Sequence, residues 1–493
     1  MEHRPLTAVW EVTMGCNMRC GHCGSSCEDQ LPGELNTQEA LSLADQIADL
    51  GLKWITLSGG EPLLRADLPL LIERFVARSV VVNIISNGWF IDAHMAQTLK
   101  RSGVSTVAIS IDGTEKVHDS IRKAGSFQRI REAVAHLKRA NVTVGAVTTI
   151  SRKNIAILPE LRRILIHMGV DLWQVQLGQP MGNFKERPDW VISPEQVPDI
   201  IDFCSETAMD GEIKIFPADC IGYYTEQELM IRQSAGIGGP ASIWSGCNAG
   251  MRNFGILHNG DILGCTSIRD KSFIEGNIRE QPLSHIWLNP AGFAWCRNAS
   301  KAQLQGDCAI CIYASKCLGG CSNTRLTMNG HIYSDNQYCA YNVALKKLRE
   351  RLLQETDALW LTAQAEYSLA NNEFQTAAFF TDRVLMLDPD EKKALAIKGF
   401  AEFMCGNYIL CESANRIALA LDPDDAYAMK GLGLALHKQG DSARGLEYLE
   451  KAADITNYAD ADVMHDLEFV RREIELIQGE LDHAAHKTGH KEH

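Results

Sequence analysis

The sequence predicts an α/β fold in its first half, a partial (β/α)6 TIM-like barrel over residues 1–238. We expect this barrel to be followed by a cysteine-rich domain over residues 239–343 and by all-α repeats over residues 344–480. Three observations support this division. Strand-like and helix-like segments alternate in the first half of the chain, eight cysteines fall within residues 247–339, and a short motif recurs 34 residues apart near the C-terminus. Residues 481–493 are polar, and we predict a disordered tail there.

The first 235 residues alternate short β-branched runs with amphipathic stretches such as 37–51 and 126–140. This rhythm predicts parallel strands joined by crossover helices. A full or partial β/α barrel is the leading prediction, and a doubly wound open sheet is the alternative. The predicted strands are residues 8–13, 54–58, 81–86, 106–111, 142–150, 173–177 and 212–216.

The second half of the chain begins after a glycine-rich stretch at 234–242, which predicts a domain boundary. A charged helix is expected at 343–356. Beyond it, LDPD occurs at 387–390 and again at 421–424, and Ala365, Gly399 and Gly433 recur at the same 34-residue period. This pattern resembles tetratricopeptide repeats. We expect three repeats over 357–460 and a capping helix near 462–480.

The composition excludes several function classes. The net charge of −14 argues against an extended nucleic-acid surface, which needs a basic balance. The sequence has no run of roughly 18 apolar residues, so we expect no transmembrane helix. The first twelve residues lack a signal-peptide profile. We therefore expect a cytoplasmic protein with neither a membrane nor a nucleic-acid partner.

Sixteen cysteines in a reducing compartment indicate metal ligation or catalysis before disulfides. Cys16, Cys20 and Cys23 follow the first predicted strand with the spacing C-x3-C-x2-C. Three thiolates on one tight loop can bind three irons of a [4Fe–4S] cluster and leave the fourth iron open. A zinc site is the alternative, although zinc sites usually use C-x2-C pairs and four ligands. Three unrelated buried thiols are the other alternative.

The cysteine loop CNMRCGHC is followed by GGEP at 59–62, ISNG at 85–88, SIDG at 110–113 and VTTI at 147–150, each at a predicted strand end. This order of motifs resembles the radical S-adenosylmethionine (SAM) superfamily. All the motifs fall on the carboxyl edge of the barrel, where barrel enzymes place their sites. The resemblance implies that the open iron chelates SAM and that reduction cleaves SAM to a 5′-deoxyadenosyl radical.

The resemblance also implies residue roles around SAM. His22 takes a position that is often aromatic in the family, beside the adenine. Either Arg122 or Arg131 would accompany Ser110 at the ribose and carboxylate, and a solvated helix face is the alternative for each arginine. The other cofactor-binding residues expected from the strand-end motifs are Gly59, Gly60, Glu61, Pro62, Ser86, Asn87, Ser110 and Asp112.

The second cysteine group has the spacing C-x2-C-x5-C-x3-C after Cys308, with further cysteines on either side. It resembles the SPASM extension of radical SAM enzymes, which makes residues 239–343 an expected iron–sulfur (SPASM) domain. The seven motif cysteines are Cys247, Cys265, Cys308, Cys311, Cys317, Cys321 and Cys339. A zinc-ribbon module is the rival, but two closed zinc sites would need eight ligands.

By resemblance, the SPASM motif holds two auxiliary clusters, so the chain would carry three [4Fe–4S] clusters. Cys308, Cys311, Cys317 and Cys339 would hold the outer cluster, and the other three motif cysteines the inner one. The fourth ligand of the inner cluster is not in the motif. Cys220, Cys27 and Cys296 are candidates, with a buried structural thiol as the alternative for each. Cys220 is also the candidate catalytic residue, while Cys204, Cys405 and Cys411 are expected in the core.

SPASM relatives mostly modify ribosomally made peptides or proteins by crosslinking, thioether formation, epimerisation or formylglycine formation. Thr266 replaces the aspartate that sulfatase-maturing relatives use as a base, which disfavours formylglycine formation. The chain starts almost directly at the barrel, without room for a leader-binding module. We expect the repeats to dock the peptide or protein substrate instead, with a dimerisation or scaffolding surface as the alternative.

We also expect an electron donor such as flavodoxin or ferredoxin. The alternative function is a small-molecule radical SAM enzyme whose repeats only bind a partner protein. A non-enzymatic iron–sulfur scaffold would not explain GGEP together with an open cysteine triplet.

Overall fold

The computed structural model describes residues 3–234 and 244–488. The predicted boundary at residues 238–239 lies outside the described residues. The chain forms two compact units. The barrel unit comprises Met1–Ala309 and Ala314–Val343, and the repeat unit comprises Ile310–Tyr313 and Ala344–His493.

The described part of the barrel unit contains one ten-stranded sheet with the order β10-β9-β8-β1-β2-β3-β4-β5-β6-β7. Strands β1 to β7 are parallel and neighbours in sequence are neighbours in the sheet. They are β1 (Thr7–Thr13), β2 (Trp54–Gly59), β3 (Val81–Ser86), β4 (Thr106–Ser110), β5 (Thr143–Ile150), β6 (Leu172–Leu177) and β7 (Lys214–Pro217). All seven predicted strands form, and each of them, including β7, is followed by a helix, which gives seven β–α units where six are predicted.

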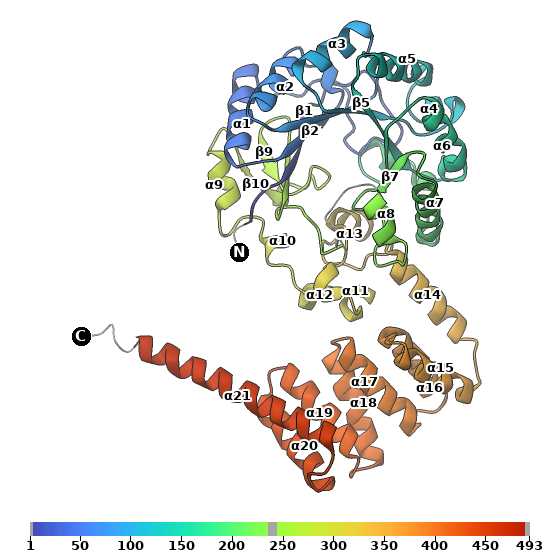
Figure 1. Ribbon diagram of the computed structural model, residues 1–493, viewed down its shortest axis with the longest axis vertical. Coiled ribbons are helices and arrows are strands. Elements are labelled where there is room, and N and C mark those ends of the chain that lie inside the picture. Colours follow the sequence, from blue (N-terminus) through green and yellow to red (C-terminus); the bar gives the residue numbers. More distant parts are fainter. Residues whose placement is uncertain (1–2, 235–243, 489–493) are drawn as a thin grey trace. The chain divides into compact units, whose positions relative to one another are not determined.

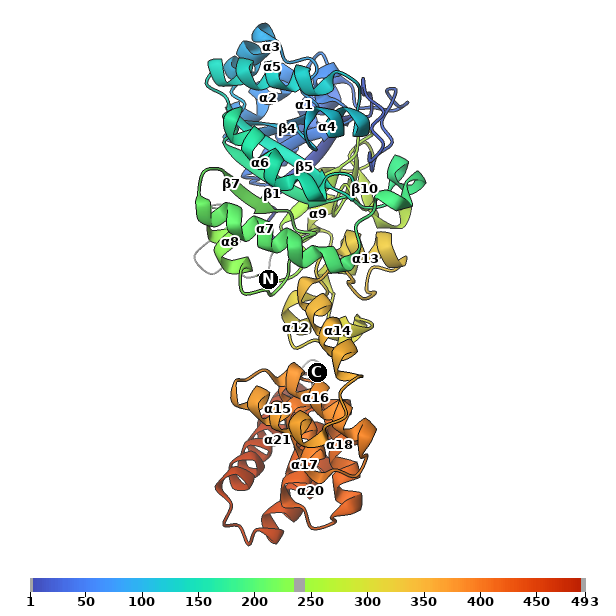
Figure 2. The same cartoon turned by 90° about the vertical axis from the view of Figure 1, so that its right-hand side faces the viewer.

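Because the strand order never reverses, right-handed crossovers place every connecting helix on the same face of the sheet. A doubly wound sheet would need a reversal, so the α/β prediction with a parallel sheet is confirmed. Figure 1 and Figure 2 show these helices outside the curved sheet. They are α1 (Thr37–Asp49), α2 (Leu68–Ala77), α3 (Ala93–Ser102), α4 (Glu115–Ile121), α5 (Ser126–Arg139), α6 (Leu158–His167), α7 (Val197–Asp210) and α8 (Glu228–Ser234).

The main core lies between the sheet and these helices. Trp10 of β1 meets Phe75 of α2 edge to face, with ring centroids 6.4 Å apart. Trp173 of β6 meets Phe203 of α7 in the same way. Helix α1 begins with a capping box between Asn36 and Glu39, which satisfies backbone donors at its first turn. The burial of alternate strand residues therefore fixes which face of each strand meets the helices.

The cysteine-rich segment extends the barrel sheet instead of forming a separate fold. Strand β8 (Asn253–Ile256) pairs in parallel with β1, and β9 (Asp261–Leu263) and β10 (Ile274–Asn277) continue antiparallel. Strand β8 satisfies the unpaired backbone edge of β1, and the predicted boundary between the barrel and the cysteine-rich domain stays a prediction. Short helices follow: α9 (Leu283–Leu288), α10 (Ala294–Arg297), α11 (Asp307–Ile310), α12 (Ala314–Cys317), α13 (Ser322–Asn329) and α14 (Ala340–Leu352).

The repeat unit consists of helix pairs followed by a long helix. The pairs are α15 (Ala358–Ala370) with α16 (Phe374–Leu387), α17 (Lys392–Met404) with α18 (Tyr408–Leu421), and α19 (Ala426–Lys438) with α20 (Ser442–Ile455). The first helices begin 34 residues apart, and each has an acidic N-cap side chain, from Asp357, Glu391 and Asp425. The many C-terminal helices are confirmed, and their tetratricopeptide identity stays a prediction.

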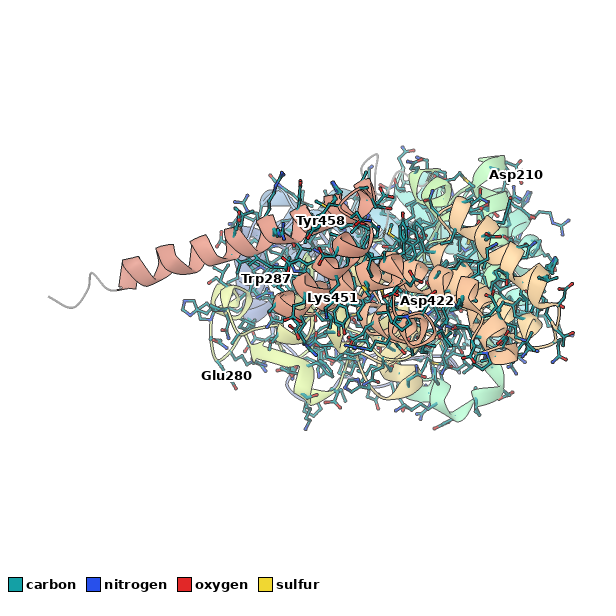
Figure 3. The ribbon with its side chains drawn as sticks, turned by 90° about the horizontal axis from the view of Figure 1, so that it is seen from below. Asp210, Glu280, Trp287, Asp422, Lys451 and Tyr458 are labelled. Carbon is teal, nitrogen blue, oxygen red and sulfur yellow. The ribbon has the colours of Figure 1, made fainter. Side chains whose placement is uncertain are left out.

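The small repeat residues mark close helix contacts. A β-carbon on Gly433 would lie 2.7 Å from the Gly445 carbonyl oxygen, so no larger residue fits between α19 and α20. The third repeat has ITNY where the others have LDPD. There Asn457 and Tyr458 take positive φ, and the Tyr458 hydroxyl, labelled in Figure 3, donates a hydrogen bond to Asp454.

Helix α21 (Ala461–Thr488) continues past the predicted capping helix. The helix includes residues 481–488, LDHAAHKT, which contain several strong helix formers, whereas a disordered tail is predicted from residue 481. Residues 489–493 lie outside the described residues. In the described ranges, no helix combines the length and apolar character needed to cross a membrane.

The repeat unit also holds a short segment of the cysteine-rich region. Within this unit, the Gln375 side chain accepts a hydrogen bond from the Ile312 amide at 3.2 Å. The Asn407 side chain donates to the Ile310 carbonyl at 2.9 Å. These two contacts fix the backbone on both sides of Cys311.

Candidate functional site

The predicted cluster loop follows β1 and is held by backbone contacts along its length. The Cys16 amide donates to the Glu28 carbonyl at 2.7 Å, and the Cys23 amide donates to the Cys20 carbonyl at 3.2 Å. Asn183, from the segment after β6, donates its backbone amide to the Cys23 carbonyl and its side chain to the Cys20 carbonyl. The loop is therefore positioned from both sides without using its thiols.

The three thiols of the loop interact electrostatically with one another. Burial raises the pKa of Cys16, and it raises that of Cys20 to about 11. A hydrogen bond from the Cys27 thiol lowers the pKa of Cys23 to about 5. Among residues 3–234 and 244–488, no three His, Cys, Asp or Glu side chains gather as one bound ion would require. A [4Fe–4S] cluster has a different requirement, because cysteine thiolates bind its separate irons.

The GGEP motif presses directly on the start of this loop. A β-carbon added to Gly59 would lie 2.2 Å from the Thr13 carbonyl oxygen, and a β-carbon added to Gly60 would lie 2.1 Å from the Gly15 carbonyl oxygen. The backbone amides of Gly60 and Glu61 donate to those same carbonyls at 2.8 Å. The two glycines are therefore needed for close backbone approach between β2 and the cluster loop.

The Glu61 carboxylate is completely buried and fully used by the protein. It accepts hydrogen bonds from the Ser86 hydroxyl at 2.8 Å, the Asn87 amide at 2.8 Å and the Leu63 amide at 3.2 Å. Burial raises the pKa of Glu61 to about 7. These hydrogen bonds tie GGEP to the end of β3, and the contact of Glu61 with SAM stays a prediction. Pro62 starts the short helix after Glu61.

Asn87 connects β3 to the cluster loop. Its side-chain amide donates to the Asn17 side-chain oxygen at 2.7 Å and lies 4.0 Å from the Cys16 sulfur. The Asn17 side-chain nitrogen is buried and has no hydrogen-bond partner in the structure. This orphaned donor therefore lies next to the first predicted iron ligand.

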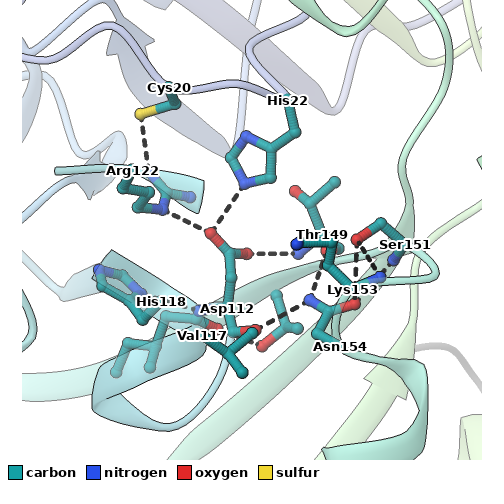
Figure 4. A network of polar contacts seen from close by, with 12 residues as sticks. Cys20, His22, Asp112, Val117, His118, Arg122, Thr149, Ser151, Lys153 and Asn154 are labelled. Carbon is teal, nitrogen blue, oxygen red and sulfur yellow. Dashed lines mark hydrogen bonds and ion pairs between the residues drawn. The ribbon is translucent and has the colours of Figure 1, made fainter. Parts of the chain in front are cut away.

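Asp112, just after β4, is the centre of a buried polar network shown in Figure 4. Its carboxylate accepts from His22 Nε2 at 2.8 Å, from Arg122 Nε at 2.5 Å and from the Thr149 amide at 2.9 Å. Burial alone would raise the pKa of Asp112, but the Arg122 guanidinium and His22 hold it well below its ordinary value. The Nη1 atom of Arg122 also lies 3.9 Å from the Cys20 sulfur. The network thus links the cluster loop to β4 and β5.

The structure separates the two candidate arginines. Arg122, at the end of α4, is in the Asp112 network, whereas Arg131 is exposed on α5 outside it. Ser110 is buried at the end of β4. His22 is buried, and its Nδ1 atom has no hydrogen-bond partner in the structure. Orphaned polar atoms on Asn17 and His22 fit a polar ligand such as SAM beside the loop.

Sequence reasoning missed two residues of this network. The Asn154 side chain donates to the carbonyls of Asp112 and Thr149, both at 2.9 Å. His118 accepts from the Asp112 amide at 3.1 Å, and burial lowers its pKa to about 4. The signal in the sequence that could have indicated His118 is its position six residues after Asp112.

The inner face of the sheet, opposite the helices, keeps partial exposure. Alternate residues of β2, β3 and β6 are buried against the helices, while Thr56, Ser58, Asn83, Gln174 and Gln176 remain partly accessible. Near the carboxyl edge these inner side chains carry neutral amide and hydroxyl groups. This face can therefore offer hydrogen bonds to a ligand without offering it charge.

Further amides join this edge to the SPASM-like segment. The Gln179 side chain donates to Thr324 at 2.6 Å and accepts from the Asn323 side chain at 2.5 Å. Both partners lie in α13, directly after Cys321. Glu11 is a charged residue on the inner face, and it is ion-paired with Arg269.

Cys220 is placed with the expected inner cysteine group. Its sulfur accepts a hydrogen bond from the Leu177 amide at 3.3 Å, at the end of β6. It interacts electrostatically with Cys265 and Cys321, and Cys247 interacts with the same two thiols. Burial raises the pKa of both Cys220 and Cys265 to about 11. Tyr223, which sequence reasoning missed, accepts from the Cys321 amide at 3.0 Å.

The other two fourth-ligand candidates differ from each other. Cys27 hydrogen-bonds Cys23 in the radical-cluster loop, which places it away from the inner group. Cys296 donates to the Phe293 carbonyl at 3.1 Å and interacts with Cys247. Cys220 and Cys296 therefore remain as candidates.

Three of the expected outer ligands lie in the barrel unit and the fourth, Cys311, in the repeat unit. The Cys308 sulfur accepts from the Asn336 amide at 3.4 Å and lies 3.7 Å from the Asn342 side-chain nitrogen. Cys317 and Cys339 are buried. Within the repeat unit, Cys311 accepts from the Tyr313 amide at 3.4 Å. Cys204, Cys405 and Cys411 are buried, as expected for core thiols.

Comparisons with known proteins agree with this geometry. The model of the Radical SAM superfamily matches residues 10–156, and that of the SPASM iron–sulfur cluster-binding domain matches residues 247–312. An AdoMet-dependent heme synthase from Methanosarcina barkeri is 28% identical over 355 residues, which cover 70% of this chain and 99% of the relative. A mycofactocin maturase, MftC, from Mycobacterium tuberculosis is 28% identical over 320 residues, covering 64% and 78%.

The fold resembles that of Streptococcus suis SuiB bound to S-adenosylmethionine, with a TM-score of 0.55 and 17% identity. This similarity covers 67% of this chain and 76% of SuiB. SuiB bound to its precursor peptide SuiA gives the same TM-score.

Proposed function

We propose that this chain modifies a peptide or protein substrate. It is an enzyme with a radical SAM domain and a SPASM domain, and its cofactors are SAM and multiple [4Fe–4S] clusters. The expected product class is a crosslink, a thioether or an epimerised residue. A radical cluster held by Cys16, Cys20 and Cys23 would supply the one electron needed for reductive cleavage of SAM to the 5′-deoxyadenosyl radical that the expected reactions require.

The chain's own residues prepare this site. Cys16, Cys20 and Cys23 would hold the radical cluster, and Gly60 holds their loop against β2. Asp112 fixes the orientation of His22, whose orphaned Nδ1 is a candidate partner for SAM. The seven SPASM cysteines would hold two auxiliary clusters, for a total of three.

The neutral inner face is the observation that supports a peptide substrate. Gln176 donates to Thr149 at 3.1 Å, and Gln179, Asn323 and Thr324 continue the row of amides and hydroxyls. Such groups match the alternating donors and acceptors of a peptide backbone. A substrate with several carboxylates would instead favour arginine or lysine on this face.

Two further proposals concern partners. We propose that the helical repeats dock the substrate, because stacked helix pairs can present extended binding surfaces. The exposed apolar side chains Leu359, Tyr367, Phe400 and Met404 on α15 and α17 support this role. A cytoplasmic flavodoxin or ferredoxin would supply the electron.

A small-molecule substrate is the second candidate. It is favoured by the heme-synthase relative, whose entire length is nearly covered by this chain. In this case the repeats would bind a partner protein instead of the substrate. The two candidates therefore predict different substrates for the same radical site.

Coexpression with a candidate precursor peptide tests the proposal. If the product is a crosslink or a thioether, mass spectrometry should find a peptide whose mass has fallen by the loss of hydrogen. If the product is an epimer, the peptide should lose no hydrogen but should incorporate deuterium from heavy water. A matched coexpression should carry the Cys16→Ala, Cys20→Ala and Cys23→Ala variant, which lacks the proposed cluster ligands. An unchanged peptide beside a converted tetrapyrrole would support the second candidate.

A further inference from the structure

Two tryptophan–cation stacks flank the radical-cluster loop. On one side, Lys123 lies over Trp89, with its Nζ 4.3 Å from the ring centroid. On the other, Arg187 lies 4.7 Å and Lys153 5.3 Å from the Trp190 ring centroid. All three cations are exposed, while both rings are half-buried. The stacks hold the cationic side chains in place while leaving their charge available to solvent.

Both stacks contact the cluster loop itself. Lys123 donates from Nζ to the Asn17 carbonyl at 3.1 Å, directly after Cys16. On the opposite side, a β-carbon on Gly21 would lie 2.9 Å from the Trp190 ring and 3.0 Å from Arg187 Nε. Gly21 lies between Cys20 and His22. The stacks therefore border the loop at the two points nearest the expected iron ligands.

The charge around the loop differs in sign from that of the whole chain. The exposed charged residues of segments 123, 152–153 and 185–189 are Lys123, Arg152, Lys153, Lys185, Arg187, Glu186 and Asp189. Five cations against two anions give these segments a net charge of +3, and the exposed Arg19, Glu28 and Asp29 of the loop itself lower the sum to +2, on a chain whose net charge is −14. Among the described residues, Lys123, Lys153 and Arg187 form no ion pair with a carboxylate. This surface is thus a local attractor for an acidic partner.

We propose that this surface is the docking site for an acidic one-electron carrier protein. The net charge of the chain would repel an acidic carrier, whereas the cations beside the loop would attract it and so orient it toward the cluster. The half-buried Trp89 and Trp190 would supply apolar contact area beside the cations. In the transfer, the carrier loses one electron and the cluster gains it, with no atom exchanged. The proposal depends on the radical cluster and not on the identity of the substrate.

The test compares two sources of the same electron. Wild-type enzyme and the Lys153→Glu/Lys185→Glu variant are reconstituted, and 5′-deoxyadenosine formation is measured with reduced flavodoxin or with dithionite. The flavodoxin-driven rate should fall about tenfold in the variant, since steering by local charge changes association rates by at least that factor. The dithionite-driven rate should stay at the wild-type value. The Lys153→Arg/Lys185→Arg variant should keep both rates.

Lys100→Glu/Arg101→Glu is the matched control. Lys100 is an exposed lysine like Lys153 and Lys185, but it lies at the end of α3, before β4 and on the opposite edge of the sheet. This control should keep both rates. Equal loss with both reductants would overturn the proposal, because the lysines would then support the loop alone. Unchanged flavodoxin-driven cleavage, or loss confined to peptide turnover, would also overturn it.

Discussion

Replacing Gly60 with alanine should force the GGEP strand end away from the cluster loop. The new methyl carbon would lie 2.1 Å from the Gly15 carbonyl oxygen and 2.8 Å from that of Met14. Both atoms are backbone, so no side-chain rotation can relieve the overlap. The Glu61 amide would then lose its 2.8 Å hydrogen bond to the Gly15 carbonyl. Because Cys16 is the next residue, the displacement would reach the cluster directly.

The magnitude follows from the two losses together. Overpacking of a rigid site costs about 1–3 kcal/mol, and each hydrogen bond lost adds about 1 kcal/mol. With the Gly60 and Glu61 amides both displaced, we expect a loss of roughly 3–5 kcal/mol in the stability of the barrel unit. Iron retention at the radical cluster should fall with it. Urea titration followed by the visible absorbance of the clusters, together with iron content, measures both effects.

Gly24→Ala is the control for this substitution. It lies in the same loop, but a β-carbon there has its nearest neighbour, Met181 Cβ, at 3.7 Å, which is ordinary contact. We expect a change within about 1 kcal/mol and unchanged iron. Wild-type stability and iron content in Gly60→Ala would refute the argument that close backbone approach positions the loop.

Three further predictions test other parts of the account. Replacing Cys16, Cys20 and Cys23 with alanine should leave the auxiliary iron and abolish 5′-deoxyadenosine formation, and undiminished product would contradict the ligand assignment. Cys220→Ala should lower iron content if Cys220 is a ligand, or alter the product with iron retained if it acts on the substrate, whereas wild-type iron and product would show only a packed thiol. Truncation after Gln354 should preserve cofactor cleavage and reduce substrate turnover, and unchanged turnover would contradict substrate docking on the repeats.

The strands and the motif order could be predicted from the sequence because their signals are local. Alternating β-branched residues specify β2 to β7, and each motif then falls at a known strand end. The contact between His22 and Asp112 spans 90 residues and has no local signal. Neither does the pairing of β8 with β1, because a four-residue strand such as NFGI has little pattern of its own.

Arg122 and Arg131 show why the site could be predicted only in part. The sequence offered both, since each follows SIDG in a helical stretch. The choice depends on α4 ending at Ile121, which turns Arg122 back under the loop toward Asp112. Arg131 falls on the exposed side of α5. Glu61 is a similar case, because its complete burial depends on hydrogen bonds from β3.

Deuterium transfer from substrate to cofactor product tests the central claim most directly. A deuterated candidate peptide is incubated with reconstituted enzyme, SAM and dithionite, and 5′-deoxyadenosine is analysed by mass spectrometry. We predict that deuterium from the peptide appears in 5′-deoxyadenosine while the peptide is modified. Deuterium transfer from a labelled tetrapyrrole, with none from any candidate peptide, would contradict the assignment of a peptide or protein substrate.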